Sequence, residues 1–381
     1  MHPTGPTAQR FPLVARVRPA CLPLDARVGR LQQLADTASR QTDPGLASTV
    51  FNQAALLASD VGLPDYAREL CHRHAALYLT RGPLSATSAI RGLEPIVNVA
   101  RLHIRAGHHQ HGHQLLLDLY RAVTAGTEAV LDGIVVPAQL TETDEQRAEV
   151  RAWLWRVVLA DGTRALTSAG RWDEALRHIE GHRGIGRRIF DGRQVAVLAR
   201  ATANDLPGAR ALLEDTEPGE AWENAVTATL TALCRPGDRR AAEMAINRYL
   251  ALQQADGLTV FTTRLALTAL DAADPDTSAA RSLIAKVSGQ ANETGDGYVL
   301  RDLLGHSVVR ERLVPDVAGE YERMLASCAL GSAALSEPFR SRMEGALSGA
   351  EEVLKGAPHD PREPGADPLH VSSGPGARGA R

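Results

Sequence analysis

The sequence predicts an all-α protein made of antiparallel helix hairpins, because its composition favours helix and short breaks recur between helical segments. Only 4% of its 381 residues are aromatic. Ala, Leu and Arg recur throughout, and these residues lose little conformational freedom on entering a helix. The chain has 42 basic and 45 acidic residues, so it lacks the global basic field that nucleic-acid binding usually needs. We therefore expect no direct binding to nucleic acid.

The two ends of the chain are expected to lie outside the helical region. Residues 1–25 contain five prolines and no helical period, which predicts a disordered lead. Residues 356–381 are dominated by Gly, Pro and polar residues, which predicts a disordered tail. A helical repeat array is expected over 26–350, with its C-terminal helices at 291–355. Since no apolar run is long enough for a signal peptide or a membrane span, we expect no membrane contact and a cytoplasmic location.

Six breaks, each carrying Gly, Asn or Pro, divide the helical region. A small residue follows each break by five positions, and an apolar residue or cysteine follows it by nine. In a helix hairpin, a small residue at this place lets the two backbones approach closely, and the next apolar residue lies on the same face one turn later. The breaks are Gly62, Gly107, Gly170, Asn204, Gly237 and Pro275; the small residues are Ala67, Gly112, Ala175, Ala209, Ala242 and Ala280; the residues nine positions on are Cys71, Leu116, Ile179, Leu213, Ile246 and Ile284.

One hairpin resembles a known family, the tetratricopeptide repeat. Two successive intervals between breaks are 34 and 33 residues, close to the roughly 34-residue period of that family. The resemblance covers about residues 45–290 and is clearest at 150–290. It implies a tetratricopeptide-like right-handed α-solenoid, whose first helices line a concave surface for a protein or peptide partner. The residues that match the turn and second helix of the repeat, within the segment AGRWDEALRHIEGHRG, are Gly170, Trp172, Ala175 and Leu176.

A longer interval between two of the breaks indicates an insertion at about residues 121–146. Within it, VLDGIVV reads as two short β-prone runs around Asp132 and Gly133, a dipeptide that favours a tight hairpin turn. The insertion therefore predicts a small loop or β-hairpin. The next helix is expected to begin at Thr141 or Thr143, because acidic residues follow both and favour the positive end of a helix.

Two histidine-containing clusters are candidates for a chemical site. His108, His109, His111 and His113 form the run GHHQHGH at a predicted turn, but no Cys or acidic residue lies beside them to complete a metal site. In a second cluster, Cys71 and His74 occupy core positions, which predicts a packed thiol and a satisfied core histidine. We therefore expect no metal ion and no cofactor.

The candidate ligand-binding residues lie at the end of the tetratricopeptide-like hairpin. Four arginines alternate with glycines there, and guanidinium groups beside flexible backbone amides suit a carboxylate, a phosphate or an acidic peptide. Two histidines four positions apart share a helix face beside them. The alternative, an arginine-rich loop that is merely solvated, stays open. The candidate residues are Arg183, Arg187, Arg188 and Arg193, with His178 and His182.

Four further arginines lie on predicted helices of neighbouring hairpins: Arg101 and Arg105 on one, Arg151 and Arg156 on the next. The sequence leaves open which of them point into the same groove. The tryptophans are expected to belong mostly to the core, with a partly exposed anchor in a binding groove as the alternative for one of them; they are Trp153, Trp155, Trp172 and Trp222.

The usual enzyme signatures are absent: the sequence has no GxSxG, P-loop, GxGxxG after a strand, or HExxH motif. The leading functional prediction is a non-catalytic scaffold, accessory or regulatory protein that binds a protein or peptide, acidic if the arginine loop takes part. One alternative is a ligand-sensing transcriptional regulator that works with a separate DNA-binding chain. Another is an enzyme, or the obligate partner of an enzyme, with an arginine-rich anion site. The Arg-, Ala- and Gly-rich usage resembles that of actinobacterial proteins.

Overall fold

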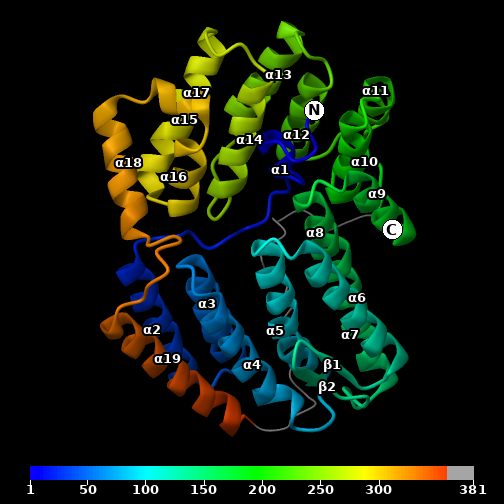
Figure 1. Ribbon diagram of the computed structural model, residues 1–381, viewed down its shortest axis with the longest axis vertical. Coiled ribbons are helices and arrows are strands. Elements are labelled where there is room, and N and C mark those ends of the chain that lie inside the picture. The colour runs from blue at the N-terminus through cyan, green and yellow to red at the C-terminus, as the bar shows by residue number, and fades with distance from the viewer. Residues whose placement is uncertain (358–381) are drawn as a thin grey trace. The chain divides into compact units, whose positions relative to one another are not determined.

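A computed structural model describes residues 1–357, most of them helical, and divides them into two compact units (Figure 1). In the described chain, unit 1 comprises residues 1–21 and 185–322, and unit 2 comprises residues 22–184 and 323–357. The tail expected at 356–381 lies outside the described residues except for its first two positions. None of the helices within 1–357 has the length and apolarity that crossing a bilayer requires.

Unit 2 consists of helices and one small hairpin. The C-terminal helix α19 packs against α2 and α3, the first helices of the unit. A π-helix, η1, interrupts the long helical stretch from α7 to α8. The elements are α2 (Leu24–Gln41), α3 (Pro44–Asp60), α4 (Pro64–Leu79), α5 (Ala86–Arg105), α6 (His109–Ala125), β1 (Ala129–Leu131), β2 (Ile134–Val136), α7 (Asp144–Val157), η1 (Val158–Gly162), α8 (Thr163–Ser168), α9 (Trp172–Gly181) and α19 (Glu337–Gly356).

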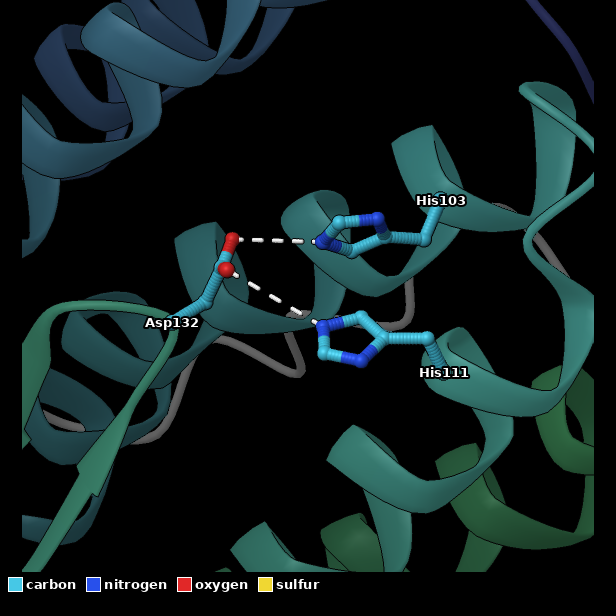
Figure 2. A group of neighbouring side chains, drawn as sticks. All are labelled: His103, His111 and Asp132. Carbon is cyan, nitrogen blue, oxygen red and sulfur yellow. Dashed lines mark hydrogen bonds and ion pairs between the residues drawn. The ribbon is translucent and has the colours of Figure 1, made fainter.

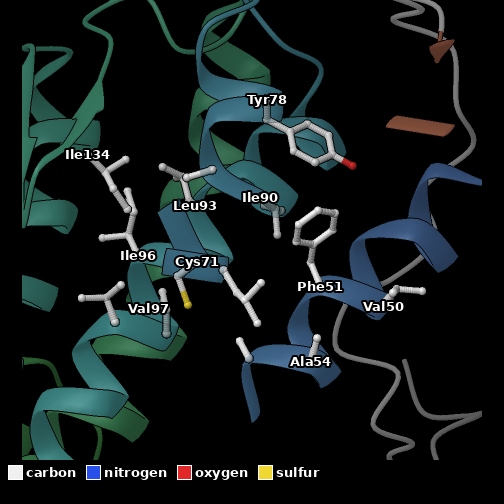
Figure 3. Packing of buried hydrophobic residues seen from close by; sticks show 14 of the residues in the cluster. Val50, Phe51, Ala54, Cys71, Tyr78, Ile90, Leu93, Ile96, Val97 and Ile134 are labelled. Carbon is white, nitrogen blue, oxygen red and sulfur yellow. The ribbon is translucent and has the colours of Figure 1, made fainter. Parts of the chain in front are cut away.

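The core of unit 2 forms where helices α3, α4 and α5 pack together (Figure 3). Phe51 of α3 stacks on the imidazole of His74 of α4, with ring centroids 5.2 Å apart. Beside them, Leu93 and Ile96 of α5 are fully buried. Burial of these aliphatic and aromatic side chains is the main force that holds the helices together.

Unit 1 is a second set of packed helices. Its elements are α1 (Pro6–Gln9), α10 (Asp191–Thr202), α11 (Leu206–Glu214), α12 (Ala221–Leu233), α13 (Arg239–Leu250), α14 (Thr259–Asp271), α15 (Ser278–Thr294), α16 (Gly297–Leu304) and α17 (Ser307–Arg312). The boundary between the two units falls within the next helix, α18 (Pro315–Ser327).

The N-terminal segment, for which the sequence predicts a disordered lead over 1–25, packs into unit 1 up to residue 21 and then enters α2. Phe11 and Leu13 are buried. The side-chain amide of Gln194 accepts a hydrogen bond from the backbone N–H of Leu13 and donates one to its carbonyl, both at 2.7 Å. One short helix, α1, begins at Pro6, where a proline is tolerated in the first turn. The rest of the segment is extended, and its backbone groups pair with side chains of a neighbouring helix.

All six breaks lie between two helices of one unit, and the helices on either side of each break are in contact. The five breaks at Gly or Asn have a positive φ, between 65° and 88°, a conformation that glycine adopts freely and asparagine tolerates. All six small residues five positions after the breaks are buried, as are the six residues nine positions after them. The predicted hairpins are therefore present in the structure.

The tightest of these hairpin contacts lies at Gly112 of α6. A Cβ atom at this position would stand 2.7 Å from the carbonyl oxygen of Ala100 and 2.8 Å from Cγ1 of Ile104, both on α5. Glycine at this place is thus what allows α5 and α6 to approach so closely.

The insertion forms the expected β-hairpin. Strands β1 and β2 pair antiparallel, with Leu131 opposite Ile134 and the turn at Asp132 and Gly133. Helix α7 then starts at Asp144, where Thr143 and Gln146 form a reciprocal capping box. Of the two predicted starting points, the structure uses Thr143.

Replacing Gly112 with Ala is expected to destabilise unit 2 by about 1–3 kcal/mol, because the new methyl group meets backbone rather than a flexible side chain. Gly345→Ala in α19 is the matched control, since nothing lies within 4 Å of a Cβ there. That variant should gain about 0.5–1 kcal/mol from helix propensity. Urea unfolding followed by tryptophan fluorescence in a Trp222→Phe background measures both changes, because the other tryptophans lie in unit 2. Shifts of the same sign in the two variants would contradict the tight contact.

Candidate functional site

The structure brings together the two predicted histidines, His178 and His182, at the end of α9. Their ring centroids are 4.5 Å apart, and the ring of His113 from α6 lies 5.0 Å from that of His178. Nε2 of His178 lies 3.0 Å from the carbonyl oxygen of Val158 in η1. Because only a protonated nitrogen can donate to a carbonyl, His178 carries its hydrogen on Nε2.

Burial holds two of these histidines, His113 and His178, in the neutral state. Burial, followed by the neighbouring His178, lowers the pKa of His113 to about 4. Burial likewise lowers the pKa of His178, against the opposing effect of its hydrogen bond to Val158. An imidazole with a lowered pKa is a weaker general base near neutral pH. His113 and His178 therefore give little support to a proton-transfer role.

The four predicted arginines are divided by the boundary between the units, which falls between Gly184 and Ile185. Arg183 is in unit 2, where it is exposed and has a φ of 53°. The other three, Arg187, Arg188 and Arg193, are in unit 1 and precede or begin α10.

The three arginines of unit 1 are each paired with carboxylates of that unit. Arg187 contacts Asp215 and Glu217 at 3.1 and 3.0 Å. Arg188 binds Glu223 through two nitrogen atoms, with Nε 2.9 Å from Oε2. Since their charges are already balanced, an anion would have to compete with these carboxylates.

Arg193 is buried and bound to its own unit by several hydrogen bonds. Its side chain is only 5% exposed. It donates to the carbonyls of Gly186 and Leu212, at 3.2 and 2.7 Å, and to Asp215 at 3.0 Å. These contacts attach the loop before α10 to the end of α11. The role of the arginine loop as a ligand site stays a prediction.

Arg151 and Arg156, by contrast, line a groove. The groove has a volume of about 400 Å³ and lies between α6 and α7. Both arginines are exposed, and neither has a carboxylate partner among residues 1–357. The half-buried side chains of Tyr120 and Trp155 are also part of the lining.

The spacing of residues along α7 explains the groove. Ala148, Arg151, Ala152, Trp155 and Arg156 follow the i, i+3, i+4, i+7, i+8 pattern of one helix face. The opposite face carries the buried residues of the core. The small side chains of the two alanines line the bottom of the groove, and the larger side chains form its walls.

A group of potential metal ligands lies at the other end of α6. His103 of α5, His111 of α6 and Asp132 of the β-hairpin turn converge on one point (Figure 2). Nε2 of His103 is 3.3 Å from Oδ2 of Asp132, and Nε2 of His111 is 4.0 Å from Oδ1. Burial lowers the pKa of His103, although Asp132 acts in the opposite direction.

No local pattern in the sequence connects Asp132 with this group. The carboxylate missing from the histidine run comes from the insertion, 21 positions after His111. The one signal that could have found it is the Asp-Gly turn, whose polar side chain must emerge from an apolar hairpin.

Cys71 and His74 are both buried, as predicted. Burial raises the pKa of the Cys71 thiol to about 12, so it stays protonated and unreactive. Nε2 of His74, however, has no hydrogen-bond partner among the described residues. The core histidine is packed but not fully satisfied.

Comparison with known proteins assigns the chain to no family. No protein-family model, curated protein or solved structure matches the chain at a significant level. Its function must therefore be inferred from its own residues.

Lowering the pH from 7 to 4.5 is expected to destabilise unit 2. Burial lowers the pKa of His74 to about 3 and is the main cause that lowers that of His113 to about 4, whereas histidine in an unfolded chain titrates near 6.5. Below pH 6.5 the unfolded state binds more protons, so the free energy of unfolding falls as the pH falls toward the folded-state pKa values. His74 alone accounts for about 2–3 kcal/mol at pH 4.5.

Urea unfolding at both pH values, in the Trp222→Phe background, measures this loss. His74→Leu should reduce the dependence of the free energy of unfolding on pH, whatever its effect on stability at pH 7. His108→Ala, at an exposed position, should leave the pH dependence unchanged. An unaltered pH dependence in His74→Leu would show that burial of this imidazole is not the cause.

Replacing Arg193 with Met is expected to destabilise α10 and α11 by about 2–4 kcal/mol, because buried acceptors lose their donor. Arg187→Ala should cost less than about 1 kcal/mol, since its ion pairs are exposed. Native-state hydrogen exchange of the amides in α10 and α11 measures both. Equal protection in Arg193→Met and the wild type would leave Arg193 free for a ligand.

Proposed function

We propose that this chain is a non-catalytic, tetratricopeptide-like helical-hairpin protein that binds a partner protein through an acidic segment. The groove between α6 and α7 is the observation that carries the proposal. It offers two arginines, Arg151 and Arg156, whose charges no carboxylate of the described chain balances. An acidic segment supplies the missing charge, and guanidinium groups bind carboxylates with two parallel hydrogen bonds.

The aromatic residues of the groove add the apolar part of the contact. Tyr120 and Trp155 are each half-buried, so their rings are fixed by the helices while one side remains accessible. Aromatic and arginine side chains dominate the binding energy of protein interfaces. Aromatic rings bury a large area with little loss of conformational entropy, and a guanidinium group forms several directed hydrogen bonds. The preferred ligand is therefore an acidic segment with an aromatic or long aliphatic side chain among its carboxylates.

The place of the groove fits the hairpin architecture. Helix α7 continues through η1 into α8, and together they form the first helix of the hairpin that ends in α9. In tetratricopeptide-like arrays the first helices line the partner-binding surface. The α7 residues of the groove therefore belong to the first helix of a hairpin, which supports the proposal, while Tyr120 joins them from α6.

Selection from a random peptide display library against the full chain tests the proposal. The selected peptides are expected to be rich in Asp, Glu and aromatic residues. Their binding should alter the fluorescence of Trp155 and weaken as salt concentration rises. The double variant Arg151→Glu, Arg156→Glu should weaken binding at least about 30-fold, because attraction becomes repulsion at both arginine positions.

Arg121→Glu serves as the control. This arginine is also exposed and lies on α6, but it pairs with Asp118 outside the groove. It should leave peptide affinity within about twofold. Selected peptides without an acidic bias, or peptides that bind the double variant as tightly as the wild type, would overturn the proposal.

A further inference from the structure

We propose that His103, His111 and Asp132 form a binding site for a divalent transition-metal ion such as Zn²⁺. The three residues come from three different elements, and each offers one donor atom; all three atoms lie within 4.8 Å of one another. This site is separate from the peptide groove and uses none of its residues.

The donor atoms are close to the positions that a metal ion requires. Two ligands about 2.0–2.1 Å from a tetrahedral ion lie about 3.4 Å apart. The pair formed by Nε2 of His103 and Oδ2 of Asp132 already has a separation of 3.3 Å. Nε2 of His111 is 4.0 Å from Oδ1, and the three donor atoms lie within 4.8 Å of one another, so a shift of about 1 Å by this exposed side chain completes the set. Figure 2 shows both rings turning their Nε2 edges toward the carboxylate.

Rigid elements hold the ligands in place. His103 lies in the last turn of α5 and His111 in the first turn of α6, joined by the tight turn at Gly107. Asp132 has a φ of 47° in the hairpin turn, and the hairpin is anchored by the buried side chains of Leu131 and Ile134. Ligands carried by packed elements keep their geometry without the ion, which lowers the cost of binding.

The ligand types select the class of ion. Two imidazole nitrogens and one carboxylate suit Zn²⁺, Fe²⁺, Co²⁺ and Ni²⁺, whereas Mg²⁺ and Ca²⁺ prefer all-oxygen sites. Three protein ligands leave one tetrahedral position for water or for a group from a partner. The side chain of His111 is 58% exposed, so an ion can reach the site from solvent.

One cation of the chain competes for the same carboxylate. Nη1 of Arg68, on α4, lies 3.5 Å from Oδ2 of Asp132. A divalent ion would be repelled by this guanidinium. The proposal therefore predicts that removing the charge of Arg68 strengthens metal binding, whereas it would weaken a purely structural ion-pair cluster.

Titration of the full chain, purified without a histidine tag, with Zn²⁺ against a chromophoric chelator tests the site. One ion per chain is expected. Asp132→Asn, His103→Ala and His111→Ala should each weaken binding at least about 30-fold, and Arg68→Gln should strengthen it several-fold. Substitution with Co²⁺ should give the visible absorption of a tetrahedral nitrogen and oxygen site in the wild type and not in Asp132→Asn.

Two controls keep the result specific. His109→Ala removes an imidazole of the same run that lies outside the cluster, and His178→Ala disrupts the other histidine group of unit 2. Both should bind Zn²⁺ like the wild type. Because His111 is exposed, its variant should keep the helical circular dichroism spectrum, so loss of binding there cannot come from misfolding. Absence of Zn²⁺ binding by the wild type, unchanged affinity in Asp132→Asn and His111→Ala, or loss in His178→Ala alone would overturn the proposal.

Discussion

The close approach of paired helices just after each turn is the constraint on which the structure of both units depends. In four of the hairpins only three residues separate the helices, and the turn residue has a positive φ. So short a turn brings the backbones together within the first turn of the second helix, where a large side chain would not fit. Gly112, against the carbonyl of Ala100, shows the limiting case. Small residues at this place therefore determine which helices pair and in which register.

The same short turns explain where polar side chains of two helices can meet to form a site. A three-residue turn places the last turn of one helix opposite the first turn of the next, so side chains flanking the turn can meet. In this way His103 and His111 meet on either side of Gly107. The turn of the β-hairpin brings Asp132 next to them. The groove arises differently. On α7, alanines occur on the face that the core does not use, and the arginines and Trp155 around them stay accessible.

The local features of this structure could be predicted from the sequence, but its long-range contacts could not. Local patterns predicted the hairpins, the Asp132 and Gly133 turn, and a helix start at Thr141 or Thr143, of which the structure uses Thr143, because these depend on residues a few positions apart. It did not predict that α19 returns to α2 and α3, or that the N-terminal segment pairs with Gln194. These contacts bridge residues more than 180 positions apart, and nothing in the local pattern specifies them.

Charge pairing limits what sequence can say about a binding site. The arginines between positions 183 and 193 form the most conspicuous cluster in the chain, yet Glu223 and Asp215 of the next hairpins neutralise Arg188 and Arg193. A ligand gains from a guanidinium only the excess over the partner it displaces. Arg151 and Arg156 have no such partner in the described chain, so an acidic ligand would gain the whole interaction. Pairing with distant carboxylates, and not arginine density, therefore decides which surface offers binding energy, and only the folded chain reveals that pairing.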